Sequence, residues 1–124
     1  EEKMGIKIPF PIIADLNKEV SKKFGMIHPL QSKTETVRCV FIIDPESKVR
    51  TILYYPLTTG RNMKEILRII DALQTTDKHK VATPANWKPG DPVVVPPPGT
   101  TEQAEERIKE DYDCKDWYLC FKKL

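Results

Sequence analysis

Two apolar runs in the middle of the sequence predict a β-hairpin. Residues 37–43 (Val-Arg-Cys-Val-Phe-Ile-Ile) and 49–55 (Val-Arg-Thr-Ile-Leu-Tyr-Tyr) are rich in β-branched and aromatic side chains. The short segment between them contains Pro45, as expected for a turn that joins two strands. Strand alternation places apolar residues on both faces of the first run, so we expect the hairpin to lie between two covering layers.

The remaining periodic segments add helices to this hairpin. Apolar residues at three- and four-residue spacing predict a helix over residues 63–73, with Asn62 as its amino-terminal cap. A short helix is predicted over residues 18–24 and a mostly charged helix over residues 101–112. Residues 12–14 follow two prolines and predict a short strand. The order of these elements predicts an α/β fold, namely an incomplete thioredoxin-like sheet with helices.

The composition changes at residue 81. Six of the 11 prolines lie between residues 84 and 98, which predicts an extended arm with polyproline character. The last segment, residues 113–124, carries too many aromatic side chains for a free end, so we expect it to dock on its own body or on another subunit. We therefore divide the chain into a core, residues 1–80, and a carboxyl-terminal arm and tail, residues 81–124.

Charge and composition restrict the function classes. The formal net charge is only +2, so nothing in the overall charge indicates a nucleic-acid or membrane partner. No apolar run approaches the length of about 18 residues that a membrane-spanning helix needs. The sequence has three cysteines, an odd number, and shows no secretion signal. We therefore expect no structural disulfide framework and a reducing, cytoplasmic location.

Arg38 is the first candidate for chemistry, because it projects from a strand that is otherwise apolar. One interpretation is structural: the guanidinium pairs with a carboxylate such as Glu35 or Asp15. The other is functional, since a guanidinium lowers the pKa of a nearby thiol and donates hydrogen bonds to an oxygen-bearing substrate. The residues alone leave both interpretations open.

Cys114 and Cys120 are the second candidates. They lie beside aromatic residues near the end of the chain, where they are either small apolar side chains of a docked tail or thiols suited to disulfide exchange. Their spacing, taken with the distant His28 and His79, matches no zinc pattern, so no metal is expected. Cys39 alternates with apolar residues and is expected to be inert core.

Several spaced blocks resemble the peroxiredoxin family, and most closely its peroxiredoxin-6 type, also called the 1-Cys type. The closing segment, Asp-Cys-Lys-Asp-Trp-Tyr-Leu-Cys-Phe, is similar to the archaeal and bacterial branch that ends in two cysteines. The other blocks are residues 36–44, 54–56, 59–62, 65–68, 10–15 and 81–87, and the Val-Val-Val-Pro-Pro-Pro run at 93–98.

This resemblance implies a thiol-dependent peroxidase that reduces hydrogen peroxide and organic hydroperoxides. By position, Arg38 would support the peroxidatic thiolate and the peroxide. Cys120 would be the first candidate for the resolving cysteine and Cys114 the second. The resemblance also implies a thiol reductant, thioredoxin-like or other, and a homodimer or higher ring oligomer formed through the carboxyl-terminal tail. It implies no cofactor.

The sequence departs from the family at one point. It contains no Pro-x-x-x-Thr-x-x-Cys motif, which carries the peroxidatic cysteine in the family. We therefore expect this chain to correspond to the carboxyl-terminal part of a peroxiredoxin and to be inactive alone. The alternative is a noncatalytic dimerisation or peroxiredoxin-binding module.

Overall fold

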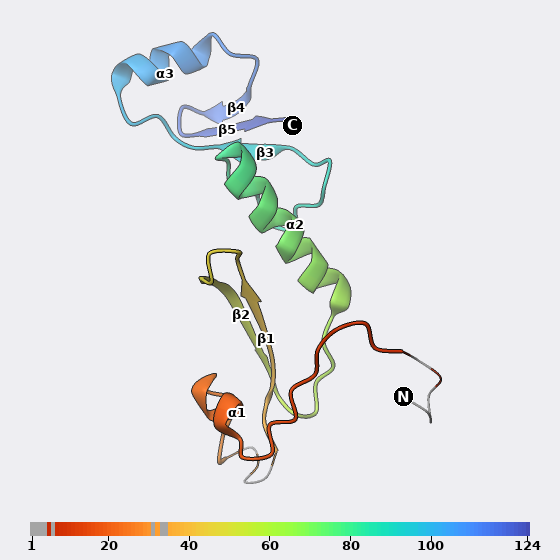
Figure 1. Ribbon diagram of the computed structural model, residues 1–124. Coiled ribbons are helices and arrows are strands. Elements are labelled where there is room, and N and C mark those ends of the chain that lie inside the picture. The colour runs from red at the N-terminus through yellow and green to blue at the C-terminus, as the bar shows by residue number, and fades with distance from the viewer. Residues whose placement is uncertain (1–4, 6, 31, 33–34) are drawn as a thin grey trace. The chain divides into compact units, whose positions relative to one another are not determined.

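The described part of the chain contains three helices and five strands, joined by loops (Figure 1). The structure is a computed structural model and describes residues 5, 7–30, 32 and 35–124, so the predicted core of residues 1–80 lies partly outside the described residues. The chain divides into two compact units, Glu1–Arg61 and Asn62–Leu124, and each is described by itself. The mixture of helices and strands confirms the predicted α/β class.

The first unit begins with the short helix α1, Glu19–Lys23. The carboxylate of Asp15 accepts hydrogen bonds from the backbone N–H groups of Val20 and Ser21, at 3.1 and 2.8 Å, and from the Ser21 hydroxyl at 2.6 Å. These donors, above all the Ser21 hydroxyl, lower the pKa of Asp15. Asp15 therefore satisfies free N–H groups at the start of the helix.

The hairpin consists of β1, Arg38–Ile43, and β2, Val49–Tyr55, which pair antiparallel as the sequence predicts. Asp44 fixes the turn, because its Oδ1 accepts from the backbone N–H groups of Glu46 at 3.0 Å and Lys48 at 2.9 Å. The register places Arg38 opposite Tyr55 at the open end of the hairpin. This register sets the position of the Arg38 side chain.

Aromatic side chains cover part of one face of the hairpin. The ring of Phe41 lies 4.8 Å from that of Phe24 and 6.1 Å from that of Tyr54, both edge to face. Ile52 and Tyr54 lie on this same face and remain 46% and 47% exposed, so its covering is incomplete. The expected covering of both faces is therefore not met within the first unit.

The strand predicted over residues 12–14 is wrong. These residues have no regular secondary structure, and Ile12 and Ile13 are 68% and 70% exposed. A strand forms only where a neighbouring strand takes up its backbone hydrogen bonds, and in the described residues neither β1 nor β2 pairs with residues 12–14. Local apolar sequence was therefore not enough to form it.

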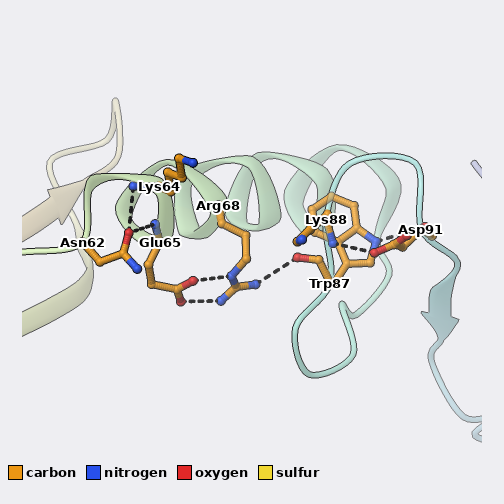
Figure 2. Close-up of polar contacts among 7 residues, drawn as sticks. All are labelled: Asn62, Lys64, Glu65, Arg68, Trp87, Lys88 and Asp91. Carbon is orange, nitrogen blue, oxygen red and sulfur yellow. Dashed lines mark hydrogen bonds and ion pairs between the residues drawn. The ribbon is translucent and has the colours of Figure 1, made fainter.

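The second unit begins with α2, Met63–His79, which continues beyond the predicted end at residue 73. Asn62 caps it as predicted, because its Oδ1 accepts from the N–H groups of Lys64 at 3.1 Å and Glu65 at 3.2 Å (Figure 2). After the apolar stripe the residues are polar but include no glycine or proline, so the helix continues. It ends at Lys80, which has a left-handed conformation.

Arg68, which pairs with Glu65 of the same helix, joins α2 to the loop that follows it (Figure 2). Arg68 donates from Nε and Nη2 to the two carboxylate oxygens of Glu65, both at 2.7 Å, and from Nη1 to the Trp87 carbonyl at 3.3 Å. The Trp87 side chain is only 3% exposed and packs in the core of this unit, together with Ala72, Val81 and Val93. Arg68, oriented by Glu65, therefore holds the backbone of the loop whose tryptophan fills the core.

A second sheet closes this unit, with the strand order β3-β5-β4. Its strands are β3, Val93–Val95, β4, Asp113–Asp116, and β5, Leu119–Lys122. β5 lies in the middle and pairs antiparallel with both neighbours. The predicted polyproline arm thus contributes a strand, and the tail docks on its own unit.

Helix α3, Thr101–Ile108, connects β3 with β4 and is shorter than the predicted 101–112. It ends early because the chain must turn back for residues 113–116 to pair with β5. Arg107 is only 8% exposed and donates to the carbonyls of Val95 at 3.1 Å and Pro96 at 3.0 Å. These bonds fix α3 against the end of β3.

In the sequence, the first unit ends at residue 61 and the second begins at residue 62, whereas the composition predicts a boundary after residue 80. Helix α2 belongs to the second unit because Ala72 shares a core with Val81, Trp87 and Val93. The division into 1–80 and 81–124 follows composition alone and stays a prediction.

The Glu65–Arg68 pair makes stability depend on pH. The hydrogen bonds from Arg68 hold the pKa of Glu65 below its usual value of 4.5. A carboxylate with a lowered pKa in the folded state stabilises the fold above its unfolded pKa, and this contribution is lost as the pH falls through the folded pKa. Between pH 6 and pH 3, the melting temperature of the wild-type chain should therefore fall further than that of Glu65→Gln.

Melting curves recorded by circular dichroism at both pH values measure this difference. Glu105→Gln, on the exposed surface of α3, is the matched control and should keep the wild-type pH profile. Parallel profiles for the wild-type chain and Glu65→Gln would show that the pair does not contribute.

Candidate functional site

Arg38 is the candidate of the first unit. It begins β1, is exposed, and donates from Nη1 to the carbonyl oxygen of Thr59 at 3.2 Å. Thr59 belongs to the loop after β2 and is held there by a hydrogen bond from its own N–H to the Pro56 carbonyl, at 3.0 Å. The loop therefore positions the guanidinium at the open end of the hairpin.

The observed acceptor differs from the one that the structural interpretation of Arg38 suggested. That interpretation named a carboxylate, such as Glu35 or Asp15, whereas Arg38 bonds a backbone carbonyl and Asp15 bonds the start of α1. A guanidinium carries five N–H donors in a planar fork. Within the described residues one of them is used, so the fork can still hold an oxygen-bearing group.

Cys39 follows Arg38 and lies opposite Tyr54 in the hairpin. Burial raises the pKa of the Cys39 thiol above its ordinary value. The Tyr54 hydroxyl donates to the Phe24 carbonyl at 2.8 Å, which fixes this side chain beside the thiol. A thiol with a raised pKa holds its proton at neutral pH and is a poor nucleophile, which agrees with the interpretation of Cys39 as inert.

Cys114 and Cys120 form a disulfide in the second unit. They lie directly opposite each other on the neighbouring strands β4 and β5, with their Cα atoms 3.9 Å apart. The sequence predicted no structural disulfide framework, and the structure has this single disulfide, with Cys39 left free. The pairing of Cys114 with Cys120 was not predicted.

The two bonded cysteines differ in exposure. Cys120 lies on the central strand and is 1% exposed, whereas Cys114 lies on an edge strand whose residues are all exposed. The turn between them presents Trp117 and Tyr118, which are 65% and 51% exposed and whose rings stack edge to face. The tail thus presents one of the two bonded cysteines and two aromatic residues to solvent.

The structure brings two of the three candidate residues together. Cys114 and Cys120 share a covalent bond, while Arg38 belongs to the other unit. The sequence analysis missed the pairing, although its signal was present: six positions separate the cysteines, and a short turn between two strand segments places such residues side by side. It also missed Thr59, since no pattern marks a loop carbonyl as an acceptor.

A metal-binding cluster and a membrane-spanning helix are both absent from the described residues. No group of three or more His, Cys, Asp and Glu side chains in this part of the chain is placed to hold a metal ion. None of its helices is long and apolar enough to cross a lipid bilayer.

Comparison with known families gives two matches along the sequence. Residues 1–52 match the AhpC/TSA family, and residues 72–111 match the C-terminal domain of 1-Cys peroxiredoxin. A peroxiredoxin from Aquifex aeolicus is 55% identical over 134 residues, which cover 100% of this chain and 60% of the relative. Peroxiredoxin 2 of Caldanaerobacter subterraneus is 57% identical, over 97% of this chain and 55% of the relative.

Solved structures give the same result. A yeast mitochondrial 1-Cys peroxiredoxin has a TM-score of 0.82 and 40% identity, covering 99% of this chain and 61% of that chain. Peroxiredoxin 6 of Arenicola marina has a TM-score of 0.80 and 42% identity, covering 96% of this chain and 59% of that chain. These similarities confirm the expected thioredoxin-like, peroxiredoxin fold. The chain spans about three-fifths of the length of the relatives it matches.

Reduction of the Cys114–Cys120 disulfide is expected to destabilise the second unit. Closing a loop across a sequence separation of six restricts the unfolded chain, which is worth about 2 kcal/mol in the free energy of unfolding. Urea denaturation, followed through the fluorescence of the buried Trp87, should show a lower midpoint in dithiothreitol. Cys39→Ser should keep this response and Cys114→Ser should lack it. Equal midpoints in both redox states would contradict the stabilising role.

Proposed function

The chain belongs to the peroxiredoxin family, and on this basis we propose that it works as part of a thiol-dependent peroxidase that reduces hydrogen peroxide and organic hydroperoxides. The observation that carries the proposal is the Arg38 strand within a chain more than 50% identical to named peroxiredoxins. The peroxidatic cysteine would come from the region of those relatives that this chain does not match.

Arg38 would act on two groups. A cation beside a thiol stabilises the thiolate and lowers its pKa, so more of the thiol is in the nucleophilic form. N–H donors aimed at a peroxide oxygen stabilise the charge that develops as the O–O bond breaks. Within the described residues the exposed guanidinium uses one donor, to Thr59, which leaves donors for both tasks.

The tail cysteines would complete the cycle. Attack of a peroxidatic thiolate on peroxide gives a sulfenic acid, which a second thiol converts into a disulfide with loss of water. Cys120 of a neighbouring subunit is the first candidate for this resolving thiol and Cys114 the second. An external thiol would then reduce the disulfide; the yeast 1-Cys peroxiredoxin is described with glutathione and thioredoxin systems, which supports a reductant of this class.

Assembly would use the carboxyl-terminal tail. The exposed edge strand β4 and the exposed rings of Trp117 and Tyr118 offer backbone and apolar groups to a second subunit, in a homodimer or a larger ring. A cytoplasmic location stays a prediction from the sequence.

This chain alone should be inactive. It lacks the Pro-x-x-x-Thr-x-x-Cys motif, and its one free cysteine, Cys39, has a raised pKa. The second candidate function is a noncatalytic dimerisation or peroxiredoxin-binding module, which the same exposed tail groups favour.

A peroxide-consumption assay with dithiothreitol separates these functions. The chain is tested alone, and then in a joined protein in which the unmatched amino-terminal region of the Aquifex aeolicus peroxiredoxin precedes it. Turnover only in the joined protein supports the peroxidase. No turnover in either, together with binding of the chain to an intact peroxiredoxin, supports the noncatalytic module.

Arg38→Met in the joined protein should slow peroxide reduction by about 100-fold or more, the loss seen when a donor to the developing charge is removed. The rate constant is measured by stopped flow with a single peroxide addition. Lys22→Met, which removes an exposed cation from α1 in the same unit, is the control and should stay within about twofold of the wild-type rate. An unchanged rate in Arg38→Met would remove this residue from the site.

Cys120→Ser in the joined protein should abolish the intersubunit disulfide that forms after peroxide treatment, because the resolving thiol is gone. Nonreducing gel electrophoresis of samples blocked with N-ethylmaleimide immediately after peroxide addition detects the covalent dimer before any later exchange. If the dimer band persists in this variant, Cys114 or no tail cysteine is the resolving residue.

A further inference from the structure

The two cysteines of the tail disulfide differ in exposure, and this difference affects how the disulfide exchanges with other thiols. A thiolate breaks a disulfide by approaching one sulfur along the S–S axis, so the accessible sulfur is the one attacked. Cys120 is 1% exposed, between β3 and β4, and offers no approach. Cys114 lies on the outer strand and is exposed.

We propose that Cys114 is the sulfur through which external thiols reduce the tail disulfide, and that Cys114 and Cys120 act in sequence as a relay. This inference rests on the proposed peroxidase for its full cycle. The polarity of the exchange, meaning which of the two sulfurs the external thiol attacks, depends only on this chain. It assigns the two cysteines successive roles, whereas the sequence left them as alternatives for one role.

The relay balances in three exchanges. First, with β5 separated from β3 and β4 so that Cys120 is accessible, the Cys120 thiolate attacks the sulfenic acid of the peroxidatic cysteine, forms an intersubunit disulfide and releases hydroxide. Second, the Cys114 thiolate attacks Cys120 Sγ, forms the Cys114–Cys120 disulfide and releases the peroxidatic thiolate. Third, an external thiolate attacks Cys114 Sγ and releases the Cys120 thiolate, and a second external thiol displaces the first as a disulfide and frees Cys114. The two electrons come from the two external thiols.

The strand register supports the second exchange. Cys114 and Cys120 are a directly opposed pair, so pairing of β4 with β5 brings the Cys114 sulfur to Cys120 Sγ. The hairpin also pairs with β3, through Val95 opposite Cys120. Formation of the sheet therefore favours the intramolecular disulfide over an intersubunit one.

One effect opposes the third exchange. Burial makes Cys120 the less stable thiolate and so the poorer leaving group, which slows its release. Attack at Cys120 would give the better leaving group, but only if β5 first separated from its neighbours. Access therefore decides the polarity while the sheet is intact.

The test of polarity uses this chain alone and no peroxide. The oxidised chain is treated briefly with 2-mercaptoethanol, an uncharged monothiol, because three charged residues, Asp113, Lys115 and Asp116, surround Cys114 in the sequence. Acid stops the exchange, N-ethylmaleimide blocks free thiols, and tryptic peptides are identified by mass. Cleavage after Lys115 places Cys114 and Cys120 on separate peptides, and the Cys39 peptide provides an internal standard.

The mixed disulfide should lie on the Cys114 peptide and the maleimide on the Cys120 peptide, with a preference of about tenfold or more. Equal labelling, or a mixed disulfide mainly on Cys120, would overturn the polarity, and so would an oxidised chain without the Cys114–Cys120 link. Because no peroxide takes part, this result does not depend on the proposed function.

The relay itself is tested in the joined protein with one equivalent of peroxide and no reductant. The wild-type protein should end with the Cys114–Cys120 disulfide and little covalent dimer, whereas Cys114→Ser should stop at the covalent dimer on nonreducing gels. A wild-type protein that keeps the same amount of dimer as Cys114→Ser would overturn the relay. Absence of peroxide consumption in both would instead reject the proposed peroxidase.

Discussion

The antiparallel pairing of β1 with β2 determines where the guanidinium of Arg38 lies. The register sets Arg38 opposite Tyr55 at the end of the hairpin, and the next loop then offers the Thr59 carbonyl to Nη1 at 3.2 Å. A shift of the register by one residue would turn Arg38 to the opposite face of the hairpin, so the turn around Asp44 indirectly fixes the cation. The proposed support of a thiolate and a peroxide depends on this placement.

Strand pairing also positions the two tail cysteines of the second unit. Pairing of β4 with β5 brings Cys114 and Cys120 together, and pairing of β5 with β3 buries only one of them. Backbone hydrogen bonds thus decide both which thiols meet and which of them solvent reaches. The Glu65–Arg68 pair and the buried Trp87 stabilise the body against which this sheet forms. Function in both units would follow from strand register rather than from a preformed cavity.

The sequence was informative where structure is local. The hairpin follows from β-branched alternation around a proline-containing turn, and the Asn62 cap follows from the residues next to it. The sequence did not predict the features that depend on pairing with a segment distant in the chain. Residues 12–14 had the composition of a strand but no neighbour. The end of α2 was missed for a different reason, because the residues after its apolar stripe include no glycine or proline that would end the helix. The disulfide and the Thr59 contact were missed because each depends on how two segments pair in space.

The central claim is that Arg38 stabilises a thiolate delivered by the region of the peroxiredoxin relatives that this chain does not match. The most direct measurement is the pKa of the peroxidatic thiol in the joined protein, followed through the ultraviolet absorbance of the thiolate during a pH titration. The account predicts a higher pKa in Arg38→Met than in the wild-type protein, because the neighbouring cation is lost. The same pKa in both proteins would contradict it.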